Sequence, residues 1–526
     1  MPALVLLVLL LSGAALPPAA HACTSIIVGK KASSDGSVFI ARNVDYPADA
    51  NITNRLLWHA PRTGALLFRS NENGFEAELP GNAPGYAAWP RFGVDPADGI
   101  STSYEEVGVN DFGVAVSSTE TIESSEAALA FDPLNNETGQ ITEDDVPSIL
   151  LPLPTATSAR QAAAALGEAI EEHGSGEGFG ILFSDAKLNA WYLENAAGHH
   201  WLAQRIPDDR FFVSANQGRF QEVDLSDTEN VMSSPGLAEF AADTGLWDPA
   251  NGTFNFFKAR AFMEDGWRDP LANYIRVCIL TQLYTGMDNA TCMGLMPSSL
   301  PVFQPPSRPL SLTDVKEGLR NYYQGSAHDP YTNENPQEQW RPIFVLRTGH
   351  AHVVQSREGV PDGLTVIQHV ALGPPALTPF VPIYKGLQPD DYPPELTEFD
   401  SAMDAQSLFW KARRVQALDF AALAPGVQDA IAAFEQDVEE VQQPAFEKAY
   451  TAAVEAKDQK KADKLMAEYT ANVVARAGAM LDQQLQHVTV ALGMNGVPDD
   501  ALLSDMMEEA TATYGLHGPT QETQGI

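Results

Sequence analysis

The chain has 526 residues, of which 44% are apolar, so it can bury a substantial core and is not expected to be disordered. Its 69 Asp and Glu residues outnumber 32 Lys and Arg residues, which gives a formal net charge of −37. Such a charge repels phosphate backbones and anionic lipid surfaces, and it argues against nucleic-acid binding and against attachment to membrane surfaces. Beyond the N-terminal region, no stretch of the sequence approaches the ~20 apolar residues that span a bilayer.

The first 22 residues have the pattern of a signal peptide. An apolar run from Leu4 to Leu11 is followed by the small-x-small triplet Ala20-His21-Ala22. Cleavage after Ala22 would make Cys23 the first residue of a secreted or periplasmic protein. A cysteine in that place carries a nucleophile and a base on one residue, because its thiol titrates near about 8.5 and its α-amino group near about 7.7 to 8.0.

Lipidation is a competing interpretation of Cys23. Lipidated cysteines also stand at the first mature position after small residues, although His21 fits that pattern poorly. Lipidation would acylate the amine and alkylate the sulfur, so it excludes catalysis by Cys23. The chain would then be a lipid-anchored binding protein.

The other two cysteines, Cys278 and Cys292, leave an odd cysteine if they pair. After export they could form a disulfide that closes a short loop. Equally, all three cysteines could be reduced and buried, as is common for free cysteine.

The segment after Cys23 predicts a β-hairpin. Thr24 to Val28 is rich in β-branched residues, Gly29 to Gly36 is rich in turn formers, and Ser37 to Asn43 resumes strand character. A turn centred near Ala32 and Ser33 sets Cys23 opposite Arg42 or Asn43. Arg42 would then favour the thiolate, and Asp45 could orient the α-amino group. The alternative is that Arg42 and Asp45 form a surface ion pair at the end of a strand.

Further strands and one helix follow. Val107 to Val116 predicts a second hairpin in the same sheet, and Ser158 to His173 predicts a helix that ends at Gly174. Short strands are expected in series at residues 180–184, 190–195, 200–205 and 211–215. The last of them runs into Asn216, which could donate a hydrogen bond to an oxyanion or simply cap a turn.

The rest of the chain predicts an α+β protein with a helical C-terminal region. Helices are expected at residues 255–283 and 312–323, and strands at 343–347, 352–355 and 365–371. From about Asp404 the composition favours long helices with apolar faces that pack on the sheet. The expected divisions are a signal peptide at 1–22, a catalytic domain at 23–400, a helical region at 401–514 and a polar tail at 515–526.

Other chemistries lack support in the sequence. His350 and His352 could share one face of a strand and chelate a metal, but no third ligand accompanies them at a fixed spacing. The sequence has no phosphate-binding loop, no Gly-x-Ser-x-Gly elbow and no His-Glu-x-x-His motif. No metal or other cofactor is therefore expected.

A series of motifs carries a resemblance to a known family. The motifs are Cys23-Thr24-Ser25-Ile26-Ile27-Val28-Gly29, Ala41-Arg42-Asn43-x-Asp45, Gly108-Val109-Asn110-Asp111-Phe112-Gly113, Trp191-Tyr192-x-Glu194, Pro207-Asp208-Asp209, Ala215-Asn216-Gln217, Arg341-Pro342-Ile343 and Ala371-Leu372-Gly373-Pro374-Pro375. Together they resemble the dipeptidase A and secernin family of N-terminal nucleophile cysteine hydrolases. These enzymes are distantly similar to bile salt hydrolase and penicillin V acylase.

The resemblance implies a four-layer αββα fold and a cysteine-type dipeptidase that needs no metal. By position it makes Cys23 the nucleophile and base, Arg42 and Asp45 its supports, and Asn216 an oxyanion donor. Arg276 matches a second arginine of the related acylases, and Thr119 and Glu120 stand where those relatives have a further site residue, so their role stays open. The partners implied are dipeptides or other short peptides, and self-association is compatible with the sequence. An acylase of non-peptide amides is the alternative within the hydrolases.

Overall fold

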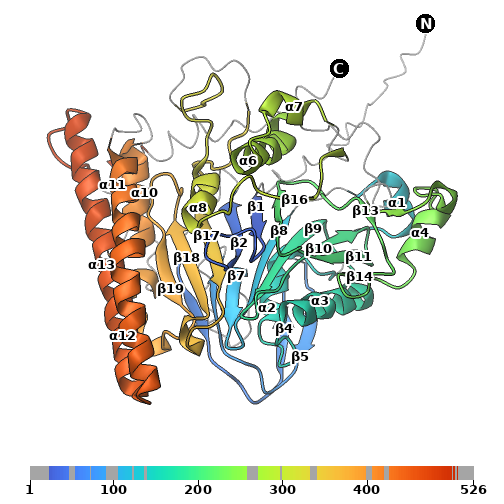
Figure 1. The fold of residues 1–526 in the computed structure, drawn as a ribbon, viewed down its shortest axis with the longest axis horizontal. Coiled ribbons are helices and arrows are strands. Elements are labelled where there is room, and N and C mark those ends of the chain that lie inside the picture. The colour runs from blue at the N-terminus through green and yellow to red at the C-terminus, as the bar shows by residue number, and fades with distance from the viewer. Residues whose placement is uncertain are drawn as a thin grey trace, which may run out of the picture.

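The computed structural model describes residues 23–46, 54–70, 73–90, 105–120, 124–135, 139–256, 270–295, 299–331, 340–397, 406–419, 426–499, 502–503 and 506. Two antiparallel sheets form its centre (Figure 1). The first sheet has the order β16 (Phe303–Gln304), β12 (Phe211–Ser214), β1 (Thr24–Val28), β2 (Val38–Asp45), β17 (Thr348–Ser356), β18 (Val366–Leu372) and β19 (Val381–Tyr384). The second has the order β14 (Val231–Ser233), β11 (His200–Arg205), β10 (Ala190–Ala196), β9 (Phe179–Asp185), β8 (Val114–Glu120), β7 (Glu105–Asn110), β6 (Tyr86–Pro90) and β3 (Leu57–His59).

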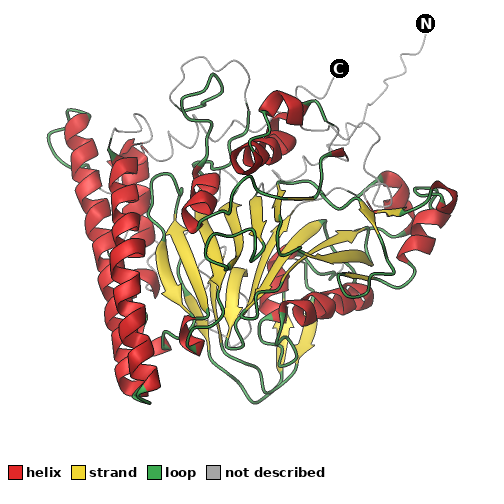
Figure 2. Cartoon of the chain, in the orientation of Figure 1, coloured by secondary structure: helices red, strands yellow, loops and turns green. Residues whose placement is uncertain are grey.

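Helices cover the outer face of each sheet (Figure 2). α6 (Ile275–Thr285), α7 (Asn289–Met293) and α8 (Leu312–Arg320) pack on the first sheet, whose outer face shares a hydrophobic cluster with them. α2 (Val146–Leu150) and α3 (Ala159–His173) pack on the second sheet in the same way. A third cluster fills the space between the sheets. These four layers confirm the predicted αββα sandwich.

The covering of both faces explains the sequence of the central strands. All residues of β1 and β2 are buried, because one face meets the second sheet and the other meets α6 and α8. The apolar residues of these strands therefore stand in consecutive runs, Ile26 to Val28 and Val38 to Ala41, and show no alternation with polar residues. The helices start where capping residues stand: the Ser158 side chain accepts from Gln161 N–H at the start of α3, and Ser311 forms a capping box with Asp314 at the start of α8.

Four C-terminal helices stand against the edge of the first sheet. They are α10 (Leu408–Asp419), α11 (Val427–Asp437), α12 (Gln443–Glu455) and α13 (Gln459–Ala491), and α13 lies beside β19 (Figure 1). Buried ion pairs join them to the sandwich: Glu435 of α11 pairs with Arg320 of α8. Among the helices that the structure describes, none combines the length and apolar character needed to cross a membrane.

The helical C-terminal region is thus present as expected, but three local predictions are wrong. The hairpin around Asn110 lies in the second sheet, because β1 and β2 already have β12 and β17 as their other neighbours. Residues 343–347 form a turn and no strand; they are apolar because the turn is buried against β2, where Asn43 Nδ2 donates to Ile343 O at 3.0 Å. Asn255 belongs to the short strand β15 (Phe254–Asn255), paired with β13 (Glu222–Val223), and not to a helix.

The signal-peptide prediction falls on residues 1–22, which lie outside the described residues. Short additional elements include the β4 (Leu66–Arg69) and β5 (Glu76–Leu79) hairpin, α1 (Glu126–Phe131), α4 (Leu237–Asp243) and α9 (Pro394–Thr397).

Candidate active site

Cys23 lies at the start of β1, near the middle of the first sheet. The observed ladder pairs Thr24 with Asn43 and Ser25 with Arg42. The predicted register is therefore wrong by one to two residues, because the connection from Gly29 to Ser37 places the turn slightly later than expected. Arg42 still reaches the thiol: its Nη1 donates to Cys23 Sγ at 3.6 Å. Cys23, Ser25 and Ile27 alternate onto one face of β1, and Ile27 packs between the sheets.

The second sheet supplies a carboxylate to Arg42. Arg42 Nη2 donates to Glu106 Oε2 at 2.6 Å and to the Glu106 carbonyl oxygen at 2.9 Å, and both side chains are buried. Glu106 is the extra residue of a β-bulge, since Trp89 of β6 pairs with Val107 and Pro90 pairs with Glu105. The bulge turns Glu106 toward the first sheet, whereas Glu105 bonds Ser148 of α2 on the outer side.

The thiol is not preformed as a thiolate. Burial raises the pKa of the Cys23 thiol above its usual value, and the charges of Asp45 and Glu106 raise it further. Arg42 and a backbone hydrogen bond with Asp45 lower this pKa, but burial outweighs them. Arg42 also forms an ion pair with Glu106, which explains why its charge does not bring the pKa of the Cys23 thiol below the usual value. A separate base must therefore take the thiol proton when the sulfur attacks a substrate.

Arg276 of α6 holds the backbone of Cys23 from the outer face of the sheet. Its Nη1 donates to Cys23 O at 2.9 Å and to Thr24 Oγ1 at 2.8 Å. Its Nη2 donates to Asn216 Oδ1 at 2.9 Å and to Asn273 Oδ1 at 2.7 Å. Arg276 thus joins Cys23 to Asn216, which follows β12 by two residues. With Oδ1 turned to Arg276, the Nδ2 end of the Asn216 amide is the end that can donate.

The Asp45 carboxylate accepts hydrogen bonds from two side chains outside the hairpin of β1 and β2. Arg341 Nη2 donates to its Oδ2 at 2.7 Å, and Thr348 Oγ1 donates to its Oδ1 at 2.6 Å. Asp45 is buried, so this is not the surface ion pair considered as an alternative. Gly349 follows Thr348 at an irregularity of the ladder, and a Cβ there would lie 1.7 Å from the Tyr46 ring. Only glycine lets Tyr46 pack there.

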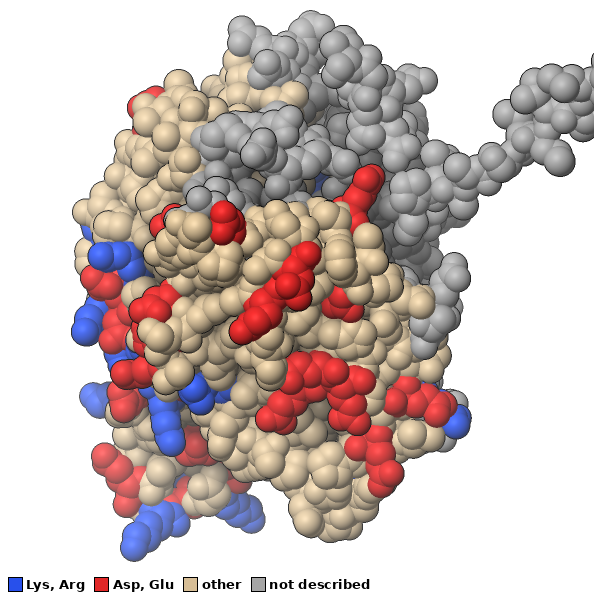
Figure 3. All heavy atoms as spheres, turned by 90° about the vertical axis from the view of Figure 1, so that its right-hand side faces the viewer, with Lys and Arg blue, Asp and Glu red and all other residues tan. Residues whose placement is uncertain are grey.

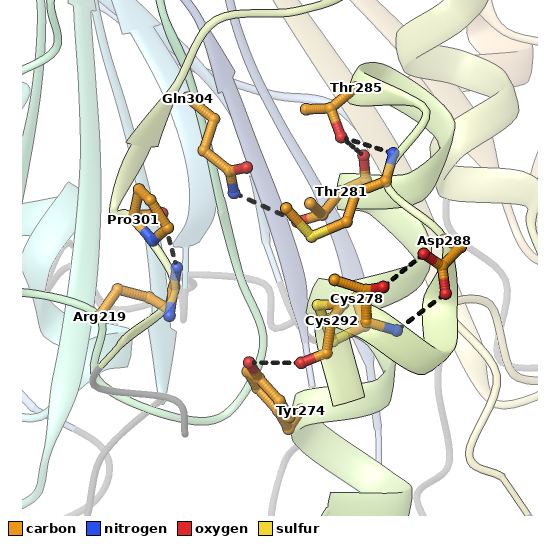
Figure 4. Close-up of a disulfide and its surroundings, with 11 residues drawn as sticks. Arg219, Tyr274, Cys278, Thr281, Thr285, Asp288, Cys292, Pro301 and Gln304 are labelled. Carbon is orange, nitrogen blue, oxygen red and sulfur yellow. Dashed lines mark hydrogen bonds between the residues drawn. A yellow bond between two sulfur atoms is a disulfide. The ribbon is translucent and has the colours of Figure 1, made fainter. Parts of the chain in front are cut away.

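A disulfide braces the helix that carries Arg276. Cys278 of α6 is bonded to Cys292 of α7, which leaves Cys23 as the free cysteine (Figure 4). Tyr274 OH donates to Cys292 O at 3.1 Å, and Asp288 caps α7 through Thr291 N–H at 2.9 Å (Figure 4). The structure thus selects the paired alternative of the two that the sequence left open.

His350 and His352 lie on one face of β17, as alternation predicts, with their rings 5.3 Å apart. Ser117 Oγ lies 3.0 Å from His352 Nε2, and Asn54 Nδ2 lies 2.8 Å from His350 Nδ1. Burial lowers the pKa of both imidazoles, so both are neutral at pH 7. Within the described residues, no three His, Cys, Asp or Glu side chains gather as metal ligands would.

The structure brings all five predicted site residues to the start of β1. Arg42 contacts the thiol, Arg276 contacts the Cys23 carbonyl group, Asn216 bonds Arg276, and Asp45 ends β2 beside them. Sequence reasoning missed Glu106 and Arg341. Glu106 depends on a bulge that leaves no clear sequence signal, but Arg341 stands in one of the motifs that carried the resemblance. Thr119 is buried in β8 and still has no assigned role.

The surface is consistent with the net charge. On the face shown in Figure 3, acidic side chains are spread over the middle, while Lys and Arg residues gather along one edge. The acidic character of the exterior thus differs from the site, where four arginines (Arg42, Arg276, Arg341 and Arg347) stand near Cys23.

Comparison with known proteins gives the family. The model of Peptidase family C69 matches residues 22–437, which include every site residue named above. The chain is 42% identical over 374 residues to a probable dipeptidase of Salmonella dublin, covering 70% of this chain and 83% of that protein. It is 31% identical over 419 residues to a dipeptidase of Bifidobacterium longum (strain NCC 2705), covering 76% and 77% of the two chains.

Two solved structures are more distant. The penicillin V acylase from Agrobacterium tumefaciens is 13% identical, with a TM-score of 0.29 over 69% of this chain and 86% of that one. A mutant conjugated bile acid hydrolase from Clostridium perfringens is 9% identical, with a TM-score of 0.30 over 72% and 95%. The family match, by contrast, covers most of the chain. The chain belongs to Peptidase family C69 and is a hydrolase of the peptidase class.

Proposed function

We propose that the chain is a metal-independent cysteine dipeptidase whose nucleophile is Cys23 as the first residue of the mature protein. The observation that carries the proposal is the position of Cys23 between two buried arginines, one on its thiol and one on its carbonyl oxygen. The names of the relatives, which include probable dipeptidases and dipeptidases, support the substrate class.

The first chemical step forms a thioester. The α-amino group of Cys23 takes the thiol proton as the sulfur attacks the peptide carbonyl carbon. The carbonyl oxygen becomes an oxyanion, and Asn216 Nδ2 donates to it. As the tetrahedral intermediate collapses, the ammonium group returns its proton to the leaving nitrogen, and the C-terminal amino acid departs with a free amino group.

The second step regenerates the enzyme. The α-amino group takes a proton from water, whose oxygen attacks the thioester carbon, and the same donor stabilises the second oxyanion. Collapse releases the N-terminal amino acid, and the sulfur recovers its proton. The raised pKa of the thiol fits this scheme, because a neutral thiol needs a base on the attacking residue.

The scheme requires removal of residues 1–22 and an unmodified amine on Cys23. We propose that the protein is secreted or periplasmic and that a signal peptidase exposes Cys23. A panel of dipeptides, assayed with and without EDTA, tests the function. Cleavage that survives EDTA and is abolished by iodoacetamide is the expected result. Loss of activity with EDTA would contradict metal independence, and cleavage of non-peptide amides alone would favour an acylase.

A further inference from the structure

A buried carboxylate near Cys23 has no hydrogen-bond partner for one of its oxygens. Glu143 begins the short helix η1 (Glu143–Asp145), which packs against β7 and β8 of the second sheet. The residue is only 4% exposed, and its Oε2 bonds to no atom of the described residues. A buried carboxylate left in this way is costly, so such groups are normally paired. Glu143 Oε2 can therefore accept a hydrogen bond from a ligand.

Glu143 interacts electrostatically with the charged groups around Cys23. Burial raises its pKa well above the usual value, and the charges of Asp144, Glu106, Glu177 and Cys23 raise it further. Its charge in turn raises the pKa of the Arg42 guanidinium. Arg42 itself is bonded to Glu106, so it does not neutralise Glu143. A cationic ligand beside Glu143 would offset the repulsion from the neighbouring negative charges.

A cation without a partner stands near the same thiol on the first sheet. Arg347 directly precedes β17, and its carbonyl oxygen accepts from Tyr46 N–H at 3.3 Å, one residue after Asp45. Its half-buried guanidinium has no hydrogen bond or ion pair with the described residues. Burial and Arg341 lower its pKa, while the charges of Asp45, Tyr331 and Cys23 raise it.

The C-terminal helices fix the turn that carries Arg347. Arg413 Nη1 and Gln416 Nε2 of α10 donate to Leu346 O at 3.1 Å and 2.8 Å. Thr348, on the other side of Arg347, donates to Asp45. Arg347 is thus held between two anchored neighbours, although its own side chain has no partner among the described residues. This arrangement favours a ligand-binding role for the guanidinium.

Other charged side chains around Cys23 already have protein partners. Arg42 is bonded to Glu106, Asp45 is bonded to Arg341, and Arg276 bonds oxygens of the backbone, of Thr24 and of two asparagines. Glu143 Oε2, from the side of the second sheet, and the Arg347 guanidinium, from the first, have no hydrogen bond or ion pair with the described residues. A free dipeptide carries the opposite pair at its two ends, and two residues of extended chain span at most about 7 Å. Its peptide bond lies between those ends, and Glu143 and Arg347 each interact electrostatically with Cys23.

We propose that Glu143 binds the α-ammonium group of the substrate and Arg347 binds its α-carboxylate, so that the site measures peptides of two residues by both ends. The inference rests on the proposed dipeptidase function and adds the residues that select substrate length. A peptide lacking either terminal charge would leave one of these groups without its counterpart, and charge-assisted hydrogen bonds give such sites strong discrimination.

The test compares blocked and free substrates in paired variants. Glu143→Gln should lose about 10- to 100-fold in kcat/KM on a free dipeptide, the factor typical of hydrogen bonds to charged groups, and should act on the N-acetylated dipeptide as wild type does. Arg347→Gln should lose a similar factor on the free dipeptide and none on the dipeptide amide. Each variant should keep the wild-type sensitivity to the block at the opposite end.

Conservative variants and stability separate binding from a structural role. Glu143→Asp and Arg347→Lys keep the charges and should recover part of the lost kcat/KM. Glu143→Gln should not lower the melting temperature, because Glu143 Oε2 makes no hydrogen bond with the described residues that the change could break. Losses that are equal on free and blocked substrates would overturn the inference while leaving the dipeptidase intact. If the wild-type protein cleaves no dipeptide at all, the proposed function fails, and the inference fails with it.

Discussion

Two buried arginines hold Cys23 from opposite faces of β1, and their hydrogen bonds differ in kind. Arg276 uses all three of its nitrogens on neutral oxygens of the backbone, of Thr24 and of two asparagines. Arg42 bonds the sulfur and a carboxylate, and its Nε has no hydrogen-bond partner in the part of the chain that the structure describes. Arg276 is therefore suited to fixing position, and Arg42 to adjusting charge at the sulfur.

The largest effect on activity is expected when the Cys23 thiol is removed. Cys23→Ala should lower kcat at least about 10⁴-fold, because loss of a catalytic nucleophile can cost up to about 10⁶. Steady-state assays on a dipeptide measure this. The melting temperature of the variant should stay near that of wild type, which excludes misfolding as the cause. Activity above 1% of wild type would place the nucleophile elsewhere.

The two arginines should differ most clearly in stability. Arg42→Met leaves Glu106 as an unpaired buried charge and should cost about 3 to 5 kcal/mol in the free energy of unfolding. Arg276→Met removes hydrogen bonds to the neutral acceptors Cys23 O, Thr24 Oγ1, Asn216 Oδ1 and Asn273 Oδ1, and it should cost about 1 to 3 kcal/mol. Urea denaturation measures both.

The double variant Arg42→Met with Glu106→Gln provides the control for the first value. It should recover most of the lost stability and none of the lost activity. Equal costs for the two single variants would contradict the assignment of different roles to the two arginines.

The Asn216 amide gives the next largest effect. Asn216→Ala should lower kcat by roughly 10² to 10³ with a smaller change in KM, as loss of an oxyanion donor does. Asn273→Ala is the matched control, since Asn273 also accepts a hydrogen bond from Arg276 Nη2. Because Asn273 Nδ2 also donates to Asn216 O at 3.0 Å, Asn273→Ala should lower kcat less than Asn216→Ala, and equal losses would assign Asn216 to this hydrogen-bond network and not to the oxyanion. A wild-type kcat in Asn216→Ala would remove it from the site.

The smallest effect concerns the charge balance at the sulfur. Glu106 raises the pKa of the Cys23 thiol, so Glu106→Gln should lower that pKa and enlarge the thiolate fraction at pH 7 to 8. Alkylation by iodoacetamide, followed against pH, should be faster than in wild type over this range, because the thiolate is the reactive form. Wild-type alkylation should rise with pH through neutrality and beyond. A slower reaction in Glu106→Gln would contradict the claim that Glu106 raises the pKa of the Cys23 thiol.

Much of the molecule could be predicted from the sequence because its central strands and caps act locally. The strands around Cys23, the helix capped by Ser158 and the long C-terminal helices follow from residue patterns over short stretches. The turn at 343–347 could not be predicted, because its apolar residues reflect burial against β2 and not a repeating ladder. The sheet that contains the hairpin around Asn110 depends on which strand edges are already occupied.

The candidate site divides in the same way. Arg42 could be placed by hairpin pairing, even with a register wrong by one to two residues, because a long side chain spans that error. Asn216 was a candidate oxyanion donor from its place after a strand, with a turn cap as the alternative, and Arg276 came from the resemblance alone. The position of Glu106 depends on a β-bulge that the sequence does not indicate. Glu143 and Arg347 can be identified as site residues only once the structure shows which neighbouring charges have partners. Such unpaired groups are a property of the tertiary structure.

The central claim is that Cys23 acts as a free N-terminal residue, and the intact mass of the exported protein tests it most directly. The expected mass is that of a chain that begins at Cys23, and inactivation by iodoacetamide should add one carbamidomethyl group. A lipid-sized addition at Cys23, or full dipeptidase activity in a chain that retains Ala22, would contradict the account.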